Sequence, residues 1–195
     1  NAFGRWGPGR TCFRALRRLP GGTAFLNAVL GYRRVFPTLA LAQRAVAPYA
    51  NSGHEHPANV KWHIDLSVSA RPSDYAAFFY LSPLMSEIKT VYDVGGNAGN
   101  LYYSYRSYLA FRPDLTWTVY DLPEPIASGR ALAAERGESQ LIFTGDWQTS
   151  SGCDLLLRSG ALHYFEEPLA RRLQRLPEKP RYILINRTPL TPQPT

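Results

Sequence analysis

The segment from Lys89 to Tyr105, KTVYDVGGNAGNLYYSY, carries the strongest structural signal in this sequence. It begins with a β-branched and aromatic run, Thr90-Val91-Tyr92, which is typical of the end of a buried strand. The run is followed by an acid, Asp93, and by a loop that contains Gly95, Gly96 and Gly99. Apolar or aromatic residues at helical spacing come next: Leu101, Tyr102, Tyr105 and Leu109. A strand, a glycine loop and a helix let backbone N–H groups approach a ligand closely, because glycine has no Cβ. The alternative interpretation is an ordinary tight turn between strand and helix.

Composition indicates a globular protein with one substantial core. The chain has 195 residues, of which 45% are hydrophobic and 13% aromatic. Its longest apolar run is far shorter than the roughly 18 residues that a spanning helix needs, and no secretory signal is visible. The two cysteines, Cys12 and Cys153, form neither a disulfide framework nor a metal-ligand pattern, and we interpret Cys153 as a small core residue. These features predict a cytoplasmic protein.

The net charge of +7 is concentrated near the N-terminus. Residues 1–61 contain nine of the 22 Lys and Arg residues but a single acid, Glu55. The positive charge therefore belongs to an N-terminal region and not to the glycine-loop domain. We interpret it either as a solvated basic face or as a contact for an anionic partner, such as a membrane surface, a glycan or a nucleotide-linked substrate.

Residues 1–69 are predicted to form a basic helical N-terminal region. Helical patterns span residues 24–32 and 38–47, and a polar loop follows at residues 48–61. This loop and the residues after it contain a group of possible ligands, His54, His56, His63 and Asp65. A lone His-x-His in a loop is not a metal-binding pattern, so no metal site is predicted.

Residues 70–195 are predicted to form an α/β domain with a doubly wound, mostly parallel sheet. Near-continuous apolar strands alternate with helices, which is typical of a parallel sheet covered on both faces. The predicted strands are 90–92, 116–122, 141–144, 154–157 and 181–186, and the predicted helices are 73–83, 126–136 and 169–176. The proline-rich residues after Asn186 are unsuited to a further strand. We therefore expect a fragment, truncated after its fifth strand.

Polar residues gather where these strands end, and ligands of open parallel sheets bind at that edge. Asp93, Asp121 and Asp146 follow three strands, and Asp121 is placed to accept the hydroxyls of an adenosine ribose. Nicotinamide cofactors and S-adenosylmethionine share this geometry. The acid precedes the glycines in Asp93–Gly99, DVGGNAG, where it repels a pyrophosphate but suits a cationic sulfonium and amino group.

The ordered motifs resemble those of class I S-adenosylmethionine-dependent methyltransferases over about residues 70–190. DVGGNAG resembles their first motif, with Asn97 where many members carry glycine, and VYDLP resembles their second-strand motif. GDW at residues 145–147 resembles the pattern of small-molecule O-methyltransferases, and CDLLLRSGALHYFEEP resembles the fourth-strand motif. With INRTPL at residues 185–190, SGALHY is similar to a largely uncharacterised bacterial family of methyltransferases.

This resemblance implies a cofactor site. Gly95, Gly96 and Gly99 would approach the methionine part, Asp121 would hold the ribose and Leu122 would pack on adenine. Asp146 and Trp147 would close the adenine pocket. Asp93, Asn97 and Ser159 are assigned to the same site. Members of this fold usually add a sixth and a seventh strand, which this sequence does not contain after Asn186.

His163 follows the fourth strand, where plant-type O-methyltransferases place a general base. An imidazole can accept the proton of a hydroxyl that attacks the methyl group. The alternative is that His163 only packs or caps. Arg158 and Arg187 stand near strand ends, where they would hold an anionic substrate group or form surface salt bridges.

The sequence thus predicts an enzyme that uses S-adenosyl-L-methionine to methylate a hydroxyl of a small molecule or glycan intermediate. Nucleic acid is disfavoured, because Arg158-Ser159-Gly160-Ala161 stands where amino-methylases carry an Asn/Asp-Pro-Pro-aromatic turn. Two alternatives stay open, an NAD(P)-dependent oxidoreductase and a non-catalytic S-adenosylmethionine-binding module. The sequence does not reveal the oligomeric state.

Overall fold

The computed structural model describes residues 70–188 without a break, residues 36–47, and positions 12, 15, 16, 18–22 and 25. The chain divides into two compact units, Asn1–Pro48 and Tyr49–Thr195. In the first unit, helix α3 spans Leu39–Val46, and the Thr38 hydroxyl accepts a hydrogen bond from the Leu41 amide at its start. The helix predicted for residues 38–47 is confirmed. The helix predicted for 24–32, apart from residue 25, the loop 48–61 and the histidine group lie outside the described residues, and the predicted domain boundary stays a prediction.

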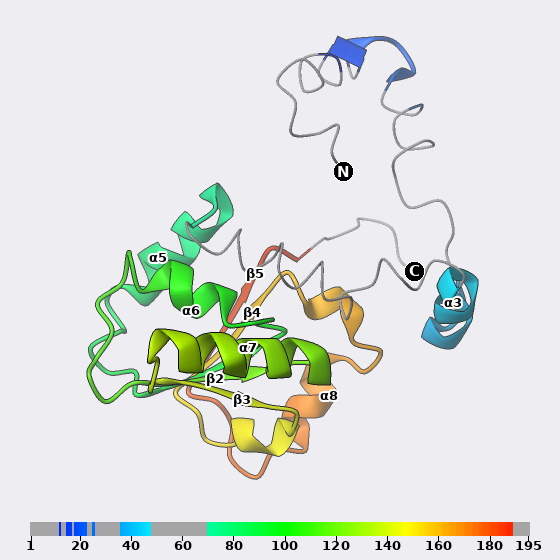
Figure 1. Ribbon diagram of the computed structural model, residues 1–195. Coiled ribbons are helices and arrows are strands. Elements are labelled where there is room, and N and C mark those ends of the chain that lie inside the picture. The colour runs from blue at the N-terminus through cyan, green and yellow to red at the C-terminus, as the bar shows by residue number, and fades with distance from the viewer. Residues whose placement is uncertain are drawn as a thin grey trace. The chain divides into compact units, whose positions relative to one another are not determined.

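The second unit is built on a five-stranded parallel sheet in the order β3-β2-β1-β4-β5 (Figure 1). All five predicted strands are present, and no end differs from its prediction by more than two residues. Their bounds are Thr90–Val94 (β1), Thr116–Tyr120 (β2), Leu141–Thr144 (β3), Leu155–Ser159 (β4) and Tyr182–Asn186 (β5). This order places β1 and β4 side by side at the centre, where the two halves of a doubly wound sheet meet.

Helices precede β1 and connect the strands of the sheet. They are η3 (Pro72–Asp74), α5 (Tyr75–Leu81), α6 (Asn100–Tyr105), α7 (Pro123–Arg136), η4 (Trp147–Ser150), η5 (Leu162–Tyr164) and α8 (Leu169–Gln174). Gly137 ends α7 with φ +65°, the left-handed conformation that glycine commonly adopts at the end of a helix. Helix α6 is shorter than the apolar pattern suggests, because Leu109 lies beyond it in a turn whose amide bonds back to Tyr105.

Both faces of the sheet are covered. The larger core cluster joins α5, α6 and α7 to one face, and a smaller cluster around Trp147, Leu156 and Leu176 includes α8 on the other. Cys153 is buried in the smaller cluster, as predicted. Helix α5 buries Phe78 but leaves Phe79 75% exposed, so only one side of this aromatic helix belongs to the core.

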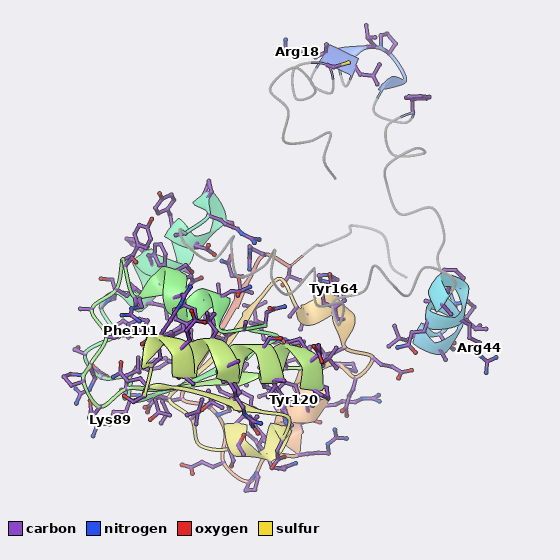
Figure 2. The ribbon with its side chains drawn as sticks, in the orientation of Figure 1. Arg18, Arg44, Lys89, Phe111, Tyr120 and Tyr164 are labelled. Carbon is purple, nitrogen blue, oxygen red and sulfur yellow. The ribbon has the colours of Figure 1, made fainter. Side chains whose placement is uncertain are left out.

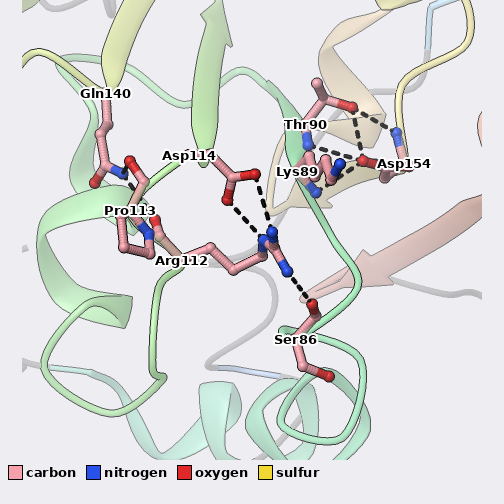
Figure 3. A network of polar contacts seen from close by, with 8 residues as sticks. All are labelled: Ser86, Lys89, Thr90, Arg112, Pro113, Asp114, Gln140 and Asp154. Atoms are coloured by element: carbon pink, nitrogen blue, oxygen red, sulfur yellow. Dashed lines mark hydrogen bonds and ion pairs between the residues drawn. The ribbon is translucent and has the colours of Figure 1, made fainter.

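The ends of the strands opposite the predicted site are fastened by hydrogen bonds (Figure 3). Asp154 Oδ2 accepts from the amides of Lys89 and Thr90 at 2.8 and 2.9 Å, which ties the start of β1 to the start of β4. Arg112 bonds both carboxylate oxygens of Asp114 and also the carbonyl of Ser86. Lys89 marks this end in Figure 2, whereas Tyr120 lies at the other end of the sheet. Within the described residues, no helix has the length and apolar content needed to cross a membrane.

Candidate functional site

A cavity of about 680 Å³ opens at the carboxyl ends of the strands. Its walls come from the loops after β1, β2, β4 and β5, together with residues at the start of η3 and on α6. The lining residues are Arg71, Asp74, Gly95, Gly96, Asn97, Asn100, Leu101, Ser104, Tyr120, Asp121, Leu122, Ser159, Gly160, Ala161, His163, Tyr164, Phe165, Glu166 and Arg187. Seven predicted site residues are therefore brought together: Gly95, Gly96, Asn97, Asp121, Leu122, Ser159 and His163.

Two glycines of the β1 loop have no room for a side chain. Gly95 has φ +76°, and a Cβ added there would stand 2.5 Å from the Cβ of Ala161. A Cβ on Gly96 would stand 2.4 Å from Asp93 Oδ2. Gly99 does not line the cavity: it begins α6 with φ +88°, and its added Cβ would meet Leu141 at 2.7 Å. The loop thus presents bare backbone to the cavity at Gly95 and Gly96.

The carboxylate of Asp121 holds this loop against the end of β2. Its Oδ2 accepts from the Asn97 amide and its Oδ1 from the Leu122 amide, both at 2.7 Å. Asn97 has φ +56°, a conformation that asparagine tolerates better than most residues. Leu122 precedes α7 and is 47% exposed. An acid and an exposed apolar side chain therefore stand together at one end of the cavity.

Asp93 lies below the loop and is not a lining residue. It is fully buried, and its Oδ2 accepts from the indole N–H of Trp117 at 3.3 Å, whereas Oδ1 has no partner among the described residues. Burial raises the pKa of Asp93 to about 7, and the charge of Asp121 adds to the rise; the Trp117 bond and Arg187 oppose it. A buried acid thus lies directly beneath Gly96.

The raised pKa of Asp93 predicts a pH-dependent stability. In the unfolded chain this carboxyl ionises near pH 3.8, but in the folded protein only near pH 7. The folded state therefore binds more protons between these values, and stability that is present below about pH 4 is lost as pH rises to about 7. Three pKa units correspond to at most about 4 kcal/mol.

Urea unfolding of the wild type and Asp93→Asn between pH 4.5 and 8 measures this effect. The variant has no carboxyl to ionise, so its unfolding free energy should rise relative to the wild type by roughly 2–4 kcal/mol across this range. Parallel pH profiles would show that Asp93 ionises normally in the folded protein.

Asp146 and Trp147 are not among the residues that line the cavity. The Asp146 carboxylate accepts from the Gln148 amide at 2.9 Å and so begins η4. Trp147 is buried, with its ring edge-on to Tyr120 at 5.8 Å and the Arg172 guanidinium 4.1 Å from it. The structure thus places Trp147 against Tyr120, and the predicted part of Asp146 and Trp147 in an adenine pocket stays a prediction.

The segment after β4 supplies another wall. His163 lies on η5, exposed and lining the cavity, and its ring is centred 4.0 Å from that of Tyr164. Tyr164 is labelled on this segment in Figure 2. Ser159, also predicted as a site residue, accepts a hydrogen bond from Arg187 Nε through its hydroxyl at 2.8 Å.

Surface salt bridging was one of the two roles considered for Arg158 and Arg187. Neither arginine forms a salt bridge with another residue among residues 70–188. Arg158 is 1% exposed and packs 4.1 Å from the ring of Phe165, and its Nη2 donates to the Ala161 carbonyl at 3.3 Å. Burial, followed by the charge of Arg172, lowers the pKa of Arg158 to about 10. Arg158 does not line the cavity itself but packs against Ala161 and Phe165, which do.

Sequence reasoning missed several lining residues. Asn100 and Ser104 are one helical turn apart on α6, and their spacing after the glycine loop was an available signal. Arg71 and Asp74 carry no local signal, because tertiary contacts bring them to the cavity. Asn186 at the end of β5 donates to the Ser73 carbonyl and to Asp74 Oδ1, which holds their segment beside the sheet.

Comparison with known proteins gives matches among solved structures only. No protein-family model matches the sequence, and no curated protein matches it. The N-terminal domain of EvdMO1 with SAH bound aligns at 18% identity and a TM-score of 0.44, over 60% of this chain and 50% of that one. A SAM-dependent methyltransferase from Aquifex aeolicus aligns at 21% identity and a TM-score of 0.44, over 65% of this chain and 71% of that one. The mitomycin 7-O-methyltransferase MmcR aligns at 18% identity and a TM-score of 0.45, over 96% of this chain and 68% of that one.

The alignments with EvdMO1, NcsB1 and an O-methyltransferase-like protein from Nostoc punctiforme span 50%, 36% and 34% of those chains, so this chain covers half their length or less. Likenesses of this strength do not transfer an activity or a ligand. The fold is evident from the sheet itself. With the strand order β3-β2-β1-β4-β5, helices on both faces and a glycine loop after β1, this chain has a doubly wound, Rossmann-like fold.

Proposed function

We propose that this domain binds S-adenosylmethionine and transfers its methyl group to a hydroxyl of a small molecule or glycan intermediate. One observation carries the proposal. The bare backbone at Gly95 and Gly96 and the carboxylate of Asp121 meet in one cavity, at the carboxyl ends of β1 and β2. That edge is where a nucleoside ligand of a doubly wound sheet is held.

The residues present fit this ligand. Asp121 would accept hydrogen bonds from the ribose hydroxyls, and the exposed side chain of Leu122 would pack on the adenine. Gly95 and Gly96 leave room for the methionine part. Asp93 lies beneath Gly96, and its buried Oδ1 has no partner among the described residues, so a cationic ligand above it would favour the ionised carboxylate. The cavity volume of about 680 Å³ is within the usual range for small-molecule sites.

The chemistry proposed asks little of the protein beyond alignment and a proton acceptor. The bound cofactor would supply an activated methyl group on its sulfonium. The loops after β1 and β4 would align the acceptor hydroxyl with it and exclude water. His163 is the candidate general base, because its exposed ring lines the same cavity. As the acceptor hydroxyl attacks the methyl carbon, the imidazole would take the hydroxyl proton.

Replacement of Asp121 by asparagine tests the ribose contact. Asp121→Asn should weaken the affinity for S-adenosylhomocysteine by roughly 1.5–3 kcal/mol, because hydrogen bonds to a charged group are lost. Titration calorimetry measures this change, about 10- to 150-fold in the dissociation constant.

Asp114→Asn is the matched control. Asp114 is an exposed acid that pairs with Arg112 at the opposite end of the sheet, so its replacement should leave ligand affinity unchanged. Equal affinities for the wild type and Asp121→Asn would remove the ribose assignment. An equal loss in both variants would indicate a general loss of structure instead.

A further inference from the structure

Two arginines line the cavity at the end furthest from Asp121. Arg71 stands just before η3, and Arg187 follows β5 directly. In the sheet, β1 and β4 separate β2, which precedes Asp121, from β5. Three strand spacings correspond to about 14 Å. The cavity therefore has an acid at one end and two cationic groups at the other.

Arg187 is held in one orientation. Its Nε donates to the Ser159 hydroxyl at 2.8 Å and its Nη2 to the Ser159 carbonyl at 3.1 Å. No hydrogen bond from its Nη1 to another residue is found within residues 70–188. Its backbone has φ +54°, which is uncommon for a residue other than glycine, and residues held in such conformations cluster at active sites and ligand clamps. One side of the guanidinium is thus fixed, and the other is available to a ligand.

Asn186 ties the segments of the two arginines together. Its Oδ1 accepts from the Arg187 amide at 2.9 Å, and its Nδ2 donates to the Ser73 carbonyl at 3.1 Å. The Arg71 amide donates to Asp74 Oδ2 at 2.9 Å, in the same short turn. This arrangement presets the backbones that carry both guanidinium groups, so a ligand meets a prepared site.

The protein leaves this positive charge largely uncompensated. Among residues 70–188, neither arginine has a carboxylate within ion-pair distance of its guanidinium. Asp74 is near but is 2% exposed, and its Oδ1 already accepts from Tyr105 and Asn186. Burial lowers the pKa of Arg71, and the charge of Arg187 lowers it further, which places the two cations within electrostatic reach of each other. Two such cations beside a cavity favour an anion between them.

We propose that Arg71 and Arg187 form a carboxylate-binding subsite at the β5 end of the cavity. This inference rests on the proposed function, because its ligand belongs to the methyl-transfer complex. Two sources carry the required group: the amino-acid carboxylate of S-adenosylmethionine and an acidic substituent on the acceptor. Guanidinium groups suit both, since their planar N–H donors match a carboxylate.

Calorimetry with paired ligands separates these sources. The variants are Arg71→Gln, Arg187→Gln and the double variant. Arg181→Gln is the control, because Arg181 is an exposed arginine just before the other end of β5. S-adenosylhomocysteine is compared with 5′-methylthioadenosine, which lacks the amino-acid part. 4-Hydroxybenzoate is compared with uncharged 4-hydroxybenzamide, and both are titrated into protein saturated with 5′-methylthioadenosine. If 5′-methylthioadenosine does not bind, the two are titrated into ligand-free protein.

If the subsite holds the cofactor's carboxylate, the double variant should lose roughly 10- to 100-fold in affinity for S-adenosylhomocysteine and nothing for 5′-methylthioadenosine. If it holds the acceptor, both nucleosides should keep their affinity, and only 4-hydroxybenzoate should bind more weakly. Arg71→Gln alone should show a smaller loss of the same kind. Arg71 lies at the protein surface with only part of its guanidinium covered, so this variant keeps the test valid if replacement of Arg187 unfolds the protein.

Unchanged affinity of the double variant for all these ligands would overturn the subsite, and so would an equal loss for charged and uncharged partners. Failure of the proposed function has a different signature: the wild type would bind neither nucleoside. The benzoate comparison on ligand-free protein would then still report on the two arginines.

Discussion

Gly95→Ala should reduce the affinity for S-adenosylmethionine by about 100-fold or more, which calorimetry would record as no measurable heat of binding. Two physical effects act together at this position. The φ of +76° disfavours any residue with a Cβ, and the new Cβ would stand 2.5 Å from the Cβ of buried Ala161. Either the loop or Ala161 must therefore move, and both line the cavity proposed to hold the cofactor.

Gly137→Ala is the matched control for backbone strain. Gly137 has a similar φ of +65°, but an added Cβ would meet nothing within 4 Å. This variant should lose about 1 kcal/mol of stability and keep its ligand affinity. Thermal unfolding of both variants checks that they fold. Wild-type affinity in folded Gly95→Ala would exclude the loop from the binding site.

His163→Ala should lower the rate of methylation by about 10²- to 10⁴-fold without changing the affinity for S-adenosylhomocysteine. The separation is expected because His163 lines the cavity from η5, after β4, whereas the proposed nucleoside contacts follow β1 and β2. Labelled S-adenosylmethionine with a panel of phenols would identify an acceptor that the wild type methylates. The rate is then measured in a single turnover, so that product release does not mask it.

Added imidazole distinguishes a general base from a packing residue. In His163→Ala, free imidazole should restore part of the rate if the lost function is proton acceptance. The ring of His163 also packs on Tyr164, so Tyr164→Leu is a useful comparison that disturbs the packing and keeps the imidazole. A loss below about threefold in His163→Ala would assign the residue to packing.

The sequence was sufficient to predict the strands of the sheet, for clear physical reasons. Strands buried on both faces, such as Leu155–Ser159, appear as near-continuous apolar runs, and each is separated from the next by a helix or a glycine turn. The site residues Gly95, Gly96 and Asp121 were equally predictable from the sequence. The end of a parallel strand fixes where the following residues lie, so their convergence in the cavity follows from the topology.

Other parts of the site depend on contacts between distant segments. Arg71 reaches the cavity because Asn186 binds its segment from more than 110 residues away, and no local pattern encodes this. Asp146 follows β3 as predicted, but its carboxylate begins η4. A strand end therefore predicts the edge at which a residue lies, but it does not predict the direction of its side chain.

Calorimetric titration of the wild-type protein with S-adenosylhomocysteine and with NAD⁺ tests the central claim most directly. The glycine loop after Asp93 and the carboxylate of Asp121 predict saturable binding of S-adenosylhomocysteine and no heat with NAD⁺, whose pyrophosphate would lie at the glycine loop, beside the acids Asp93 and Asp121. Binding of NAD⁺ without binding of S-adenosylhomocysteine would contradict the methyltransferase account and support an oxidoreductase.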